Sequence, residues 1–211
     1  IPVIILILTY SVEVRSDINV VTSIKPIHSI ASNIMDGVSE PTLLVEGTTS
    51  PHSYIMKPSH VEAINNADLI FFVSDEHLET FLSKPLSNVN NNAKIVELMD
   101  NEDLFVLKFR EKNIYLGDDH DDHDDHDEHA HGEFDIHIWL DPFNAKVIAN
   151  NIAEELSKLD PANTSTYQKN RDKFVEKVSD TEEKISQQLD HYVSYVSFHD
   201  AYQYFENRFD V

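Results

Sequence analysis

The chain has 211 residues, of which 41% are hydrophobic and 9% aromatic, enough for one large domain or two lobes with a sizeable core. Its formal net charge is −22, from 38 acidic and 16 basic residues, and it contains 12 histidines. This charge argues against nucleic acid and anionic membrane surfaces as partners and suits the binding of cations. The absence of cysteine excludes disulfides, thiolate metal sites, thiol catalysis and lipid attachment through an N-terminal cysteine.

Residues 1–16, "IPVIILILTYSVEVRS", begin with an apolar run from Ile1 to Leu8. A bilayer-spanning helix needs about 20 apolar residues, so this run is too short to cross a membrane. It has the size of the apolar core of a secretory signal, and we interpret it as a signal-peptide remnant. The alternative is a buried first strand.

Residues 17–99 alternate between apolar strands and amphipathic helices. Buried strands are predicted within residues 17–24, 41–47, 69–74 and 93–99. One helix is predicted from Pro26 to a stop at Gly37, and others within residues 57–68 and 75–86. Ser59 and Glu62 have the spacing of a capping box at the start of the second helix. The alternation predicts βαβ units and a parallel sheet, and therefore an α/β fold.

Residues 117–133 form a His/Asp-rich segment, with eight carboxylates between Asp118 and Glu128. We expect an inserted, solvated loop that offers many overlapping ligand sets, and hence several weak, pH-sensitive metal sites. Its negative charge would concentrate cations within a Debye length, ~8 Å at physiological salt. The alternative is an acidic insertion without a metal role. The auxiliary weak metal ligands are His120, His123, His126, His129 and His131.

Beyond this segment, residues 134–140 are strand-like, and Asp141 and Pro142 predict the N-cap and first position of a helix that runs to Leu159. A second helix, from Pro161 to about Asp190, carries a narrow apolar stripe suited to lying along a surface and joining two bodies. The remaining residues begin a new strand and helix. They either dock on the first lobe or belong to a lobe that is cut short.

Three histidines are expected at the carboxyl ends of strands: His52, His137 and His199. Ligands of open parallel sheets bind beyond these ends, and imidazole nitrogen suits Zn²⁺. Three such ligands with a carboxylate or a water would complete a four-coordinate site. Each histidine alone is also compatible with a structural role. Of the others, His28 and His60 lie near helix starts, and we expect no metal role for them. His77 is expected to be an exposed first-turn residue, and His191 to complement a helix C-terminus.

Several motifs together resemble the periplasmic zinc-binding subunit of bacterial zinc ABC importers, a cluster of solute-binding proteins that also carries manganese and iron. The motifs are "TSIKPIHSI", "VEGTTSPHSYIMKPSHVEAINNADLIFFV", the His/Asp-rich segment, "DIHIWLDPFNA" and "FHDAYQYFENRF". The resemblance covers the chain from about Asp17 to its end, in the family's order. It implies two α/β lobes joined by a rigid helix, with metal held in the interlobe cleft by His52, His137 and His199.

The resemblance also implies a division of the chain into parts. Residues 1–16 would be the signal remnant, 17–141 the N-terminal α/β metal-binding lobe, 142–190 helices that include the rigid interlobe helix 161–190, and 191–211 the beginning of a truncated C-terminal lobe. Two departures stand out. The family's second lobe continues past Val211 and can supply an acidic fourth ligand, and Pro51 precedes His52 where some zinc members have Glu.

The function expected from the resemblance is the capture of Zn²⁺ and its delivery to the membrane permease of an ABC importer. The protein is then a periplasmic monomer without enzymatic activity or a direct membrane anchor. The histidine segment favours zinc, because the zinc branch commonly carries one and Mn²⁺ prefers oxygen ligands. The alternatives are a manganese or iron member, a truncated zinc-buffering relic, and a zinc hydrolase with an open metal position, although no HExxH motif is present.

Overall fold

The computed structural model describes residues 18–89, 93–110, 133–189, 195–197 and 199–211. The expected signal remnant and the five auxiliary histidines lie outside these ranges. Among the residues that are described, none of the helices has both the length and the apolar character that a membrane crossing requires.

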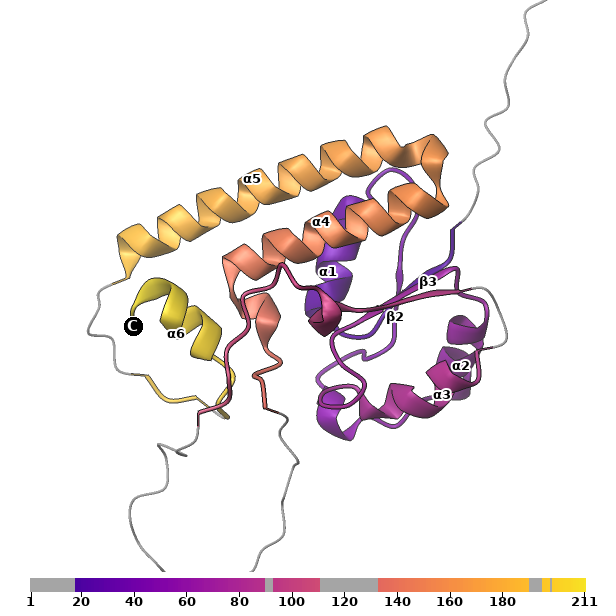
Figure 1. Ribbon diagram of the computed structural model, residues 1–211, viewed down its shortest axis with the longest axis horizontal. Coiled ribbons are helices and arrows are strands. Elements are labelled where there is room, and N and C mark those ends of the chain that lie inside the picture. The colour runs from indigo at the N-terminus through magenta and orange to yellow at the C-terminus, as the bar shows by residue number, and fades with distance from the viewer. Residues whose placement is uncertain (1–17, 90–92, 111–132, 190–194, 198) are drawn as a thin grey trace, which may run out of the picture.

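A parallel sheet of four strands organises the chain (Figure 1). The strands are β1 (Val20–Thr22), β2 (Thr42–Leu43), β3 (Leu69–Phe72) and β4 (Lys94–Glu97), in the order β2-β1-β3-β4. Val20 of β1 is in register with Leu69 of β3, and Phe72 of β3 with Glu97 of β4. The predicted α/β fold with a parallel sheet is confirmed, although each strand is shorter than the apolar stretch that predicted it.

Helices cover both faces of the sheet because side chains alternate along each strand. Val20 and Phe71 belong to a core shared with α1 (Lys25–Ile34) and α4 (Pro142–Leu159). Val21 and Ile70 belong to a second core on the opposite face, with α2 (Pro58–Asn65) and α3 (Ser83–Ser87) near it (Figure 1). Short 3₁₀ helices connect these elements: η1 (Pro51–Ser53), η2 (Thr80–Leu82), η3 (Leu98–Asp100), η4 (Ile138–Leu140) and η5 (Pro161–Asn163).

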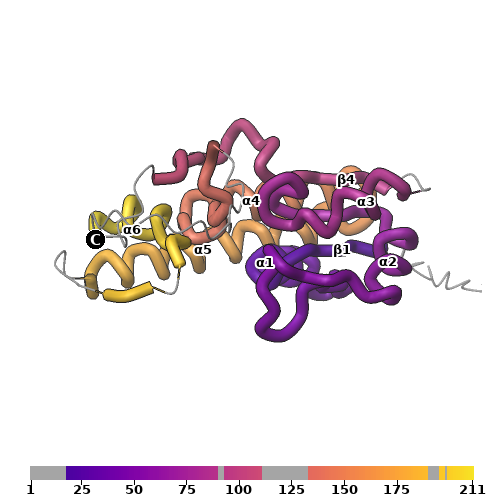
Figure 2. Tube along the Cα trace, turned by 90° about the horizontal axis from the view of Figure 1, so that it is seen from below, coloured from indigo at the N-terminus to yellow at the C-terminus, as the bar shows by residue number. Residues whose placement is uncertain are grey.

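The long helix α5 (Thr164–Gln188) lies along α4 and α1 and extends beyond them, where α6 (Gln203–Phe209) lies beside its C-terminal half (Figures 1 and 2). The predicted start of α4 is confirmed, since the Asp141 carboxylate accepts a hydrogen bond from the Phe143 amide at 2.8 Å. The predicted long helix is confirmed too, with η5 as its first turn.

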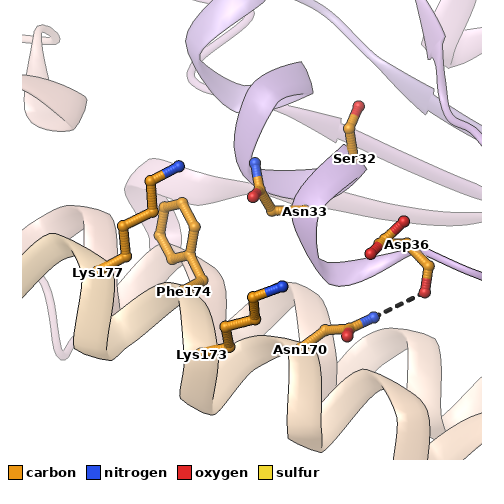
Figure 3. A pocket seen from close by; sticks show the side chains of 7 residues that line it. All are labelled: Ser32, Asn33, Asp36, Asn170, Lys173, Phe174 and Lys177. Atoms are coloured by element: carbon orange, nitrogen blue, oxygen red, sulfur yellow. Dashed lines mark hydrogen bonds between the residues drawn. The ribbon is translucent and has the colours of Figure 1, made fainter.

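Asn170 connects α5 to the end of α1 by hydrogen bonds. Its amide donates hydrogen bonds to the carbonyl of Ile34 (3.0 Å), which the end of α1 leaves without a helical partner, and to the carbonyl of Asp36 just beyond the helix (2.8 Å). Figure 3 shows the bond from Asn170 to Asp36 beside a pocket of about 290 Å³, which Lys173 and Lys177 also line. The lysines and the single carboxylate of this pocket do not form a metal-ligand set.

Some local predictions are wrong. The capping box does not form, because α2 starts two residues earlier, with Pro58 at its first position and Lys57 as an N-cap without a side-chain bond. The fixed φ of proline suits that first position and displaces Ser59 from the cap. α1 ends before Gly37, which lies beyond the C-cap Met35 with φ +80°. Residues 75–86, predicted as one helix, contain turns, η2 and part of α3.

Glu79 explains why that helix is interrupted. Its fully buried carboxyl group accepts hydrogen bonds from the Val73 amide (3.0 Å) and the Ser74 amide (2.9 Å) and lies 2.5 Å from the Ser23 hydroxyl. These partners follow β3 and β1, the neighbouring strands between which the chain order reverses. This is where doubly wound sheets bind ligands, and here a side chain of the protein fills the position.

Burial raises the pKa of Glu79 to about 7, against the smaller opposing effect of its hydrogen bonds. The folded protein therefore binds this proton more tightly than the unfolded chain, in which the pKa is near 4.5. The resulting stabilisation is complete below pH 4.5 and is lost as the pH rises to about 7.

We predict that Glu79→Gln flattens the pH dependence of stability. Between pH 5 and pH 8 the wild-type free energy of unfolding should fall by about 2 kcal/mol more than that of the variant. Urea unfolding at a series of pH values measures this difference. The variant should be less stable at every pH, because its amide NH₂ faces a backbone N–H. The informative quantity is therefore the change in the free energy of unfolding with pH. Glu62→Gln on the exposed face of α2 is the control, and equal slopes for all three proteins would contradict the prediction.

Candidate metal site

His137 is buried, with 6% of its surface exposed, and is held by the equally buried Asp135. One carboxylate oxygen of Asp135 accepts from the His137 backbone amide at 2.9 Å and lies 2.7 Å from the ring Nδ1. A carboxylate is only an acceptor, so Nδ1 carries the hydrogen and the Nε2 lone pair is left for another partner. Carboxylate–histidine pairs of this kind orient metal ligands in proteins.

The ring of His199 lies next to that of His137, with 5.4 Å between the ring centroids. Two imidazoles bound to one tetrahedral zinc at about 2.0–2.1 Å have centroids about 5 Å apart. The pair therefore has the separation that a shared metal ion requires. Desolvation and the neighbouring His137 lower the pKa of His199, against opposing effects of Asp200 and Asp135. A lowered pKa favours the neutral imidazole, the form that binds metal.

The position of His199 depends on the docking of α6 against the first lobe. The fully buried Tyr204 hydroxyl donates to the Asp135 carbonyl at 2.6 Å and accepts from the Leu107 amide at 3.2 Å. Arg208 forms a bidentate pair with Asp141, the cap of α4, through bonds of 2.8 and 2.9 Å. The last residues thus contact Leu107, Asp135 and Asp141, which all lie within residues 17–141.

His52 lies elsewhere in the described part of the chain. It is an exposed residue of η1, in the connection that follows β2. Among the described residues, no three His, Asp or Glu side chains are grouped closely enough to hold one metal ion. The structure thus brings His137 and His199 together without His52, and the set of three histidines stays a prediction.

His137 was expected at the carboxyl end of a strand, but it does not lie there. After an isolated bridge between Lys108 and Phe134 the backbone turns, and His137 is the N-cap of η4. The reason is that the Asp135 side chain bonds the backbone amide two residues ahead, a local contact that competes with strand pairing. His199 follows no strand among the described residues either.

Two further histidines have structural contacts. His28 Nδ1 lies 3.1 Å from the Thr22 hydroxyl, and His60 Nδ1 lies 2.6 Å from the Tyr54 hydroxyl. Burial lowers the pKa of both. These contacts give both histidines a structural role that the sequence did not predict.

Sequence reasoning missed Asp135. Its signal is the Asp-x-His spacing in "FDIHI", which places a carboxylate two residues before a candidate ligand. It also missed Tyr204, for which the sequence offers no signal, because its partner Asp135 is 69 residues away.

The fold and the paired histidines place the chain among α/β proteins with a candidate metal site. Residues 20–211 match the family described as "Zinc-uptake complex component A periplasmic", and the chain belongs to this family. Two relatives carry the name "High-affinity zinc uptake system protein ZnuA". The one from Brucella abortus (strain 2308) is 42% identical, over 90% of this chain and 64% of its own length. The one from Yersinia pestis is 37% identical, over 90% and 62%. The chain thus spans less than two thirds of these relatives.

Solved structures support the fold. The Mn-bound periplasmic metal binding protein from Candidatus Liberibacter asiaticus is 25% identical, with a TM-score of 0.69 over 90% of this chain and 66% of that one. The Zn(II)-bound ZnuA-like domain of Streptococcus pneumoniae AdcA is 23% identical, with a TM-score of 0.69 over 91% and 64%.

We predict that His137 of the metal-free protein is protonated on Nδ1, whereas free imidazole prefers Nε2–H. Asp135→Ala removes the acceptor and should make Nε2–H the major form. Asp135→Asn, whose amide oxygen can still accept, should retain Nδ1–H. Ring ¹⁵N shifts measured by NMR distinguish the two forms, with Glu133→Ala on the exposed side of the same segment as control. An Nε2–H form of His137 in the wild-type protein would show that Asp135 does not set the tautomer.

Proposed function

We propose that this chain is the metal-binding part of a periplasmic solute-binding protein that captures Zn²⁺ and delivers it to the membrane permease of an ABC importer. Membership of the zinc-uptake family supports this proposal. Residues 17–141 provide the N-terminal metal-binding lobe, and the helix within residues 161–190 connects this lobe to a second one. The protein binds and releases its cargo without turnover.

The observation that carries the proposal is the His137–His199 pair at 5.4 Å, with Asp135 holding Nδ1 of His137. These two imidazoles supply two of the metal ligands, and His52 supplies the third. A carboxylate or a water completes the four-coordinate sphere that zinc prefers. His52, an exposed residue of η1, reaches the pair through a rearrangement of this connection.

The His/Asp-rich segment serves as an auxiliary collector of zinc. The described residues at its two ends adjoin each other, with the Phe109 amide donating to the Glu133 carbonyl at 3.2 Å. Only three residues lie between Glu133 and His137, so the segment returns to the fold beside the proposed site. Its five histidines thus supply weak sites close to the tight one.

Zinc is favoured over manganese because the two grouped ligands are nitrogens. Manganese is the second candidate for the bound ion, because the similar protein from Candidatus Liberibacter asiaticus was solved with manganese bound. A competition titration with both ions decides between them: preference for Mn²⁺ at the first site would make this chain a manganese carrier.

We predict that the full chain binds several zinc ions and that one of them is tight. Replacing residues 118–131 with a short Gly/Ser linker should remove the weak sites and retain the tight one. His137→Ala/His199→Ala in the shortened chain should weaken the tight site by at least about 100-fold, more than the loss of an outer-shell partner does. His52→Ala should weaken it as well. Calorimetry in the presence of a competing chelator measures stoichiometry and affinity.

His77→Ala is the matched control, since His77 is a partly exposed histidine whose ion partner is Glu76. If the linker replacement abolishes all binding, the tight site is absent and the chain only buffers zinc through its His/Asp-rich segment. Zinc-dependent hydrolysis that disappears in His137→Ala would instead favour the hydrolase alternative.

A further inference from the structure

The last residue described before the His/Asp-rich segment is Arg110, at the end of a short paired stem. The stem consists of residues 107–110 and 133–135. Its two branches are joined by the Lys108–Phe134 bridge and by the bond from the Asp135 amide to the Leu107 carbonyl, at 2.8 Å. One branch of this stem thus continues directly into Asp135 and His137.

Arg110 reaches from the other branch to the part of the chain that carries His199. Its guanidinium pairs with Glu206 of α6 and lies 3.7 Å from Asp200, the residue that follows His199. Glu206 also accepts a hydrogen bond from the Tyr195 hydroxyl. The Arg110 side chain is 25% exposed and that of Glu206 is 19% exposed. Water therefore screens this cluster less than it screens a pair on the open surface.

We propose that Arg110 is a positioning residue for His199. By pairing with Asp200 and Glu206, it holds the residues on both sides of the turn before α6 against the stem that leads to His137. The two imidazoles are thereby kept at a separation that one zinc ion can bridge. This inference rests on the proposed function, because it assigns Arg110 to the site made by His137 and His199.

Lys108 provides a control for Arg110, because it carries the same charge and lies on the same branch of the stem. It lies two residues before Arg110 on the same branch, and its ammonium pairs with Glu133 at 2.5 Å. Its side chain is 70% exposed. Its backbone carbonyl accepts a hydrogen bond from the Gln203 side-chain amide of α6 at 3.0 Å, and a side-chain substitution leaves this bond in place. Lys108→Gln therefore removes the same charge near the His/Asp-rich segment without releasing the residues around His199.

The test measures zinc affinity at the tight site of the full chain by chelator competition. Arg110→Gln should weaken this site about tenfold, the lower end of the effect of outer-shell partners on metal affinity. Lys108→Gln should change it by less than about twofold. Arg110→Lys should recover part of the loss, because it keeps the charge without the planar guanidinium. Urea unfolding of each variant shows the folded fraction at which affinity is measured.

A double-mutant cycle separates positioning from general stabilisation. If Arg110 acts through His199, Arg110→Gln should have no further effect on zinc affinity once His199→Ala is present. Equal effects of Arg110→Gln and Lys108→Gln would overturn the inference, and so would an undiminished effect of Arg110→Gln in the His199→Ala background. His137→Ala tests the proposed function separately. If zinc affinity at the tight site is unchanged in this variant, the site itself is refuted, whatever the effect of Arg110→Gln.

Discussion

The Tyr204 hydroxyl, buried between the Asp135 carbonyl and the Leu107 amide, is the contact on which the proposed site depends. It holds α6 against Asp135, whose side chain orients His137. Tyr204 thus connects the segment that carries His199 with the segment that carries His137. A buried hydroxyl that loses its partners costs about 1–3 kcal/mol, which favours one docked position for α6. His199, just ahead of that helix, is placed as a consequence.

Ion pairs reinforce this docking in a protein of strongly negative charge. With 16 basic residues against 38 acidic ones, most carboxylates have no cation of their own. Yet Arg208 and Arg110 both pair with carboxylates across the α6 contact, and Lys146 of α4 pairs with Glu182 of α5 at 2.8 Å. These cations join elements that are distant in sequence. The remaining negative charge is free to attract a divalent cargo.

Features set by a single local signal were predictable from the sequence, whereas features decided by competing local signals or by distant contacts were not. The Asp141–Pro142 cap of α4 and the apolar strands depend on local chemistry, and both were predicted. The Ser59 cap failed because Pro58 competes for the same turn. Residues 134–140 have the composition of a strand, but the Asp135 carboxylate turns the backbone into η4. The approach of His199 to His137 depends on contacts between residues 69 and 67 positions apart, which no local pattern encodes.

We expect zinc to bind first between His137 and His199. Ring ¹⁵N signals of all histidines, followed by NMR while zinc is added to the metal-free chain, test this order of binding. The ring signals of His137 and His199 should shift together at the first equivalent, before those of His120, His123, His126, His129 and His131. If the histidines of the His/Asp-rich segment shift first, or if only one of His137 and His199 responds, zinc does not bind first between these two residues.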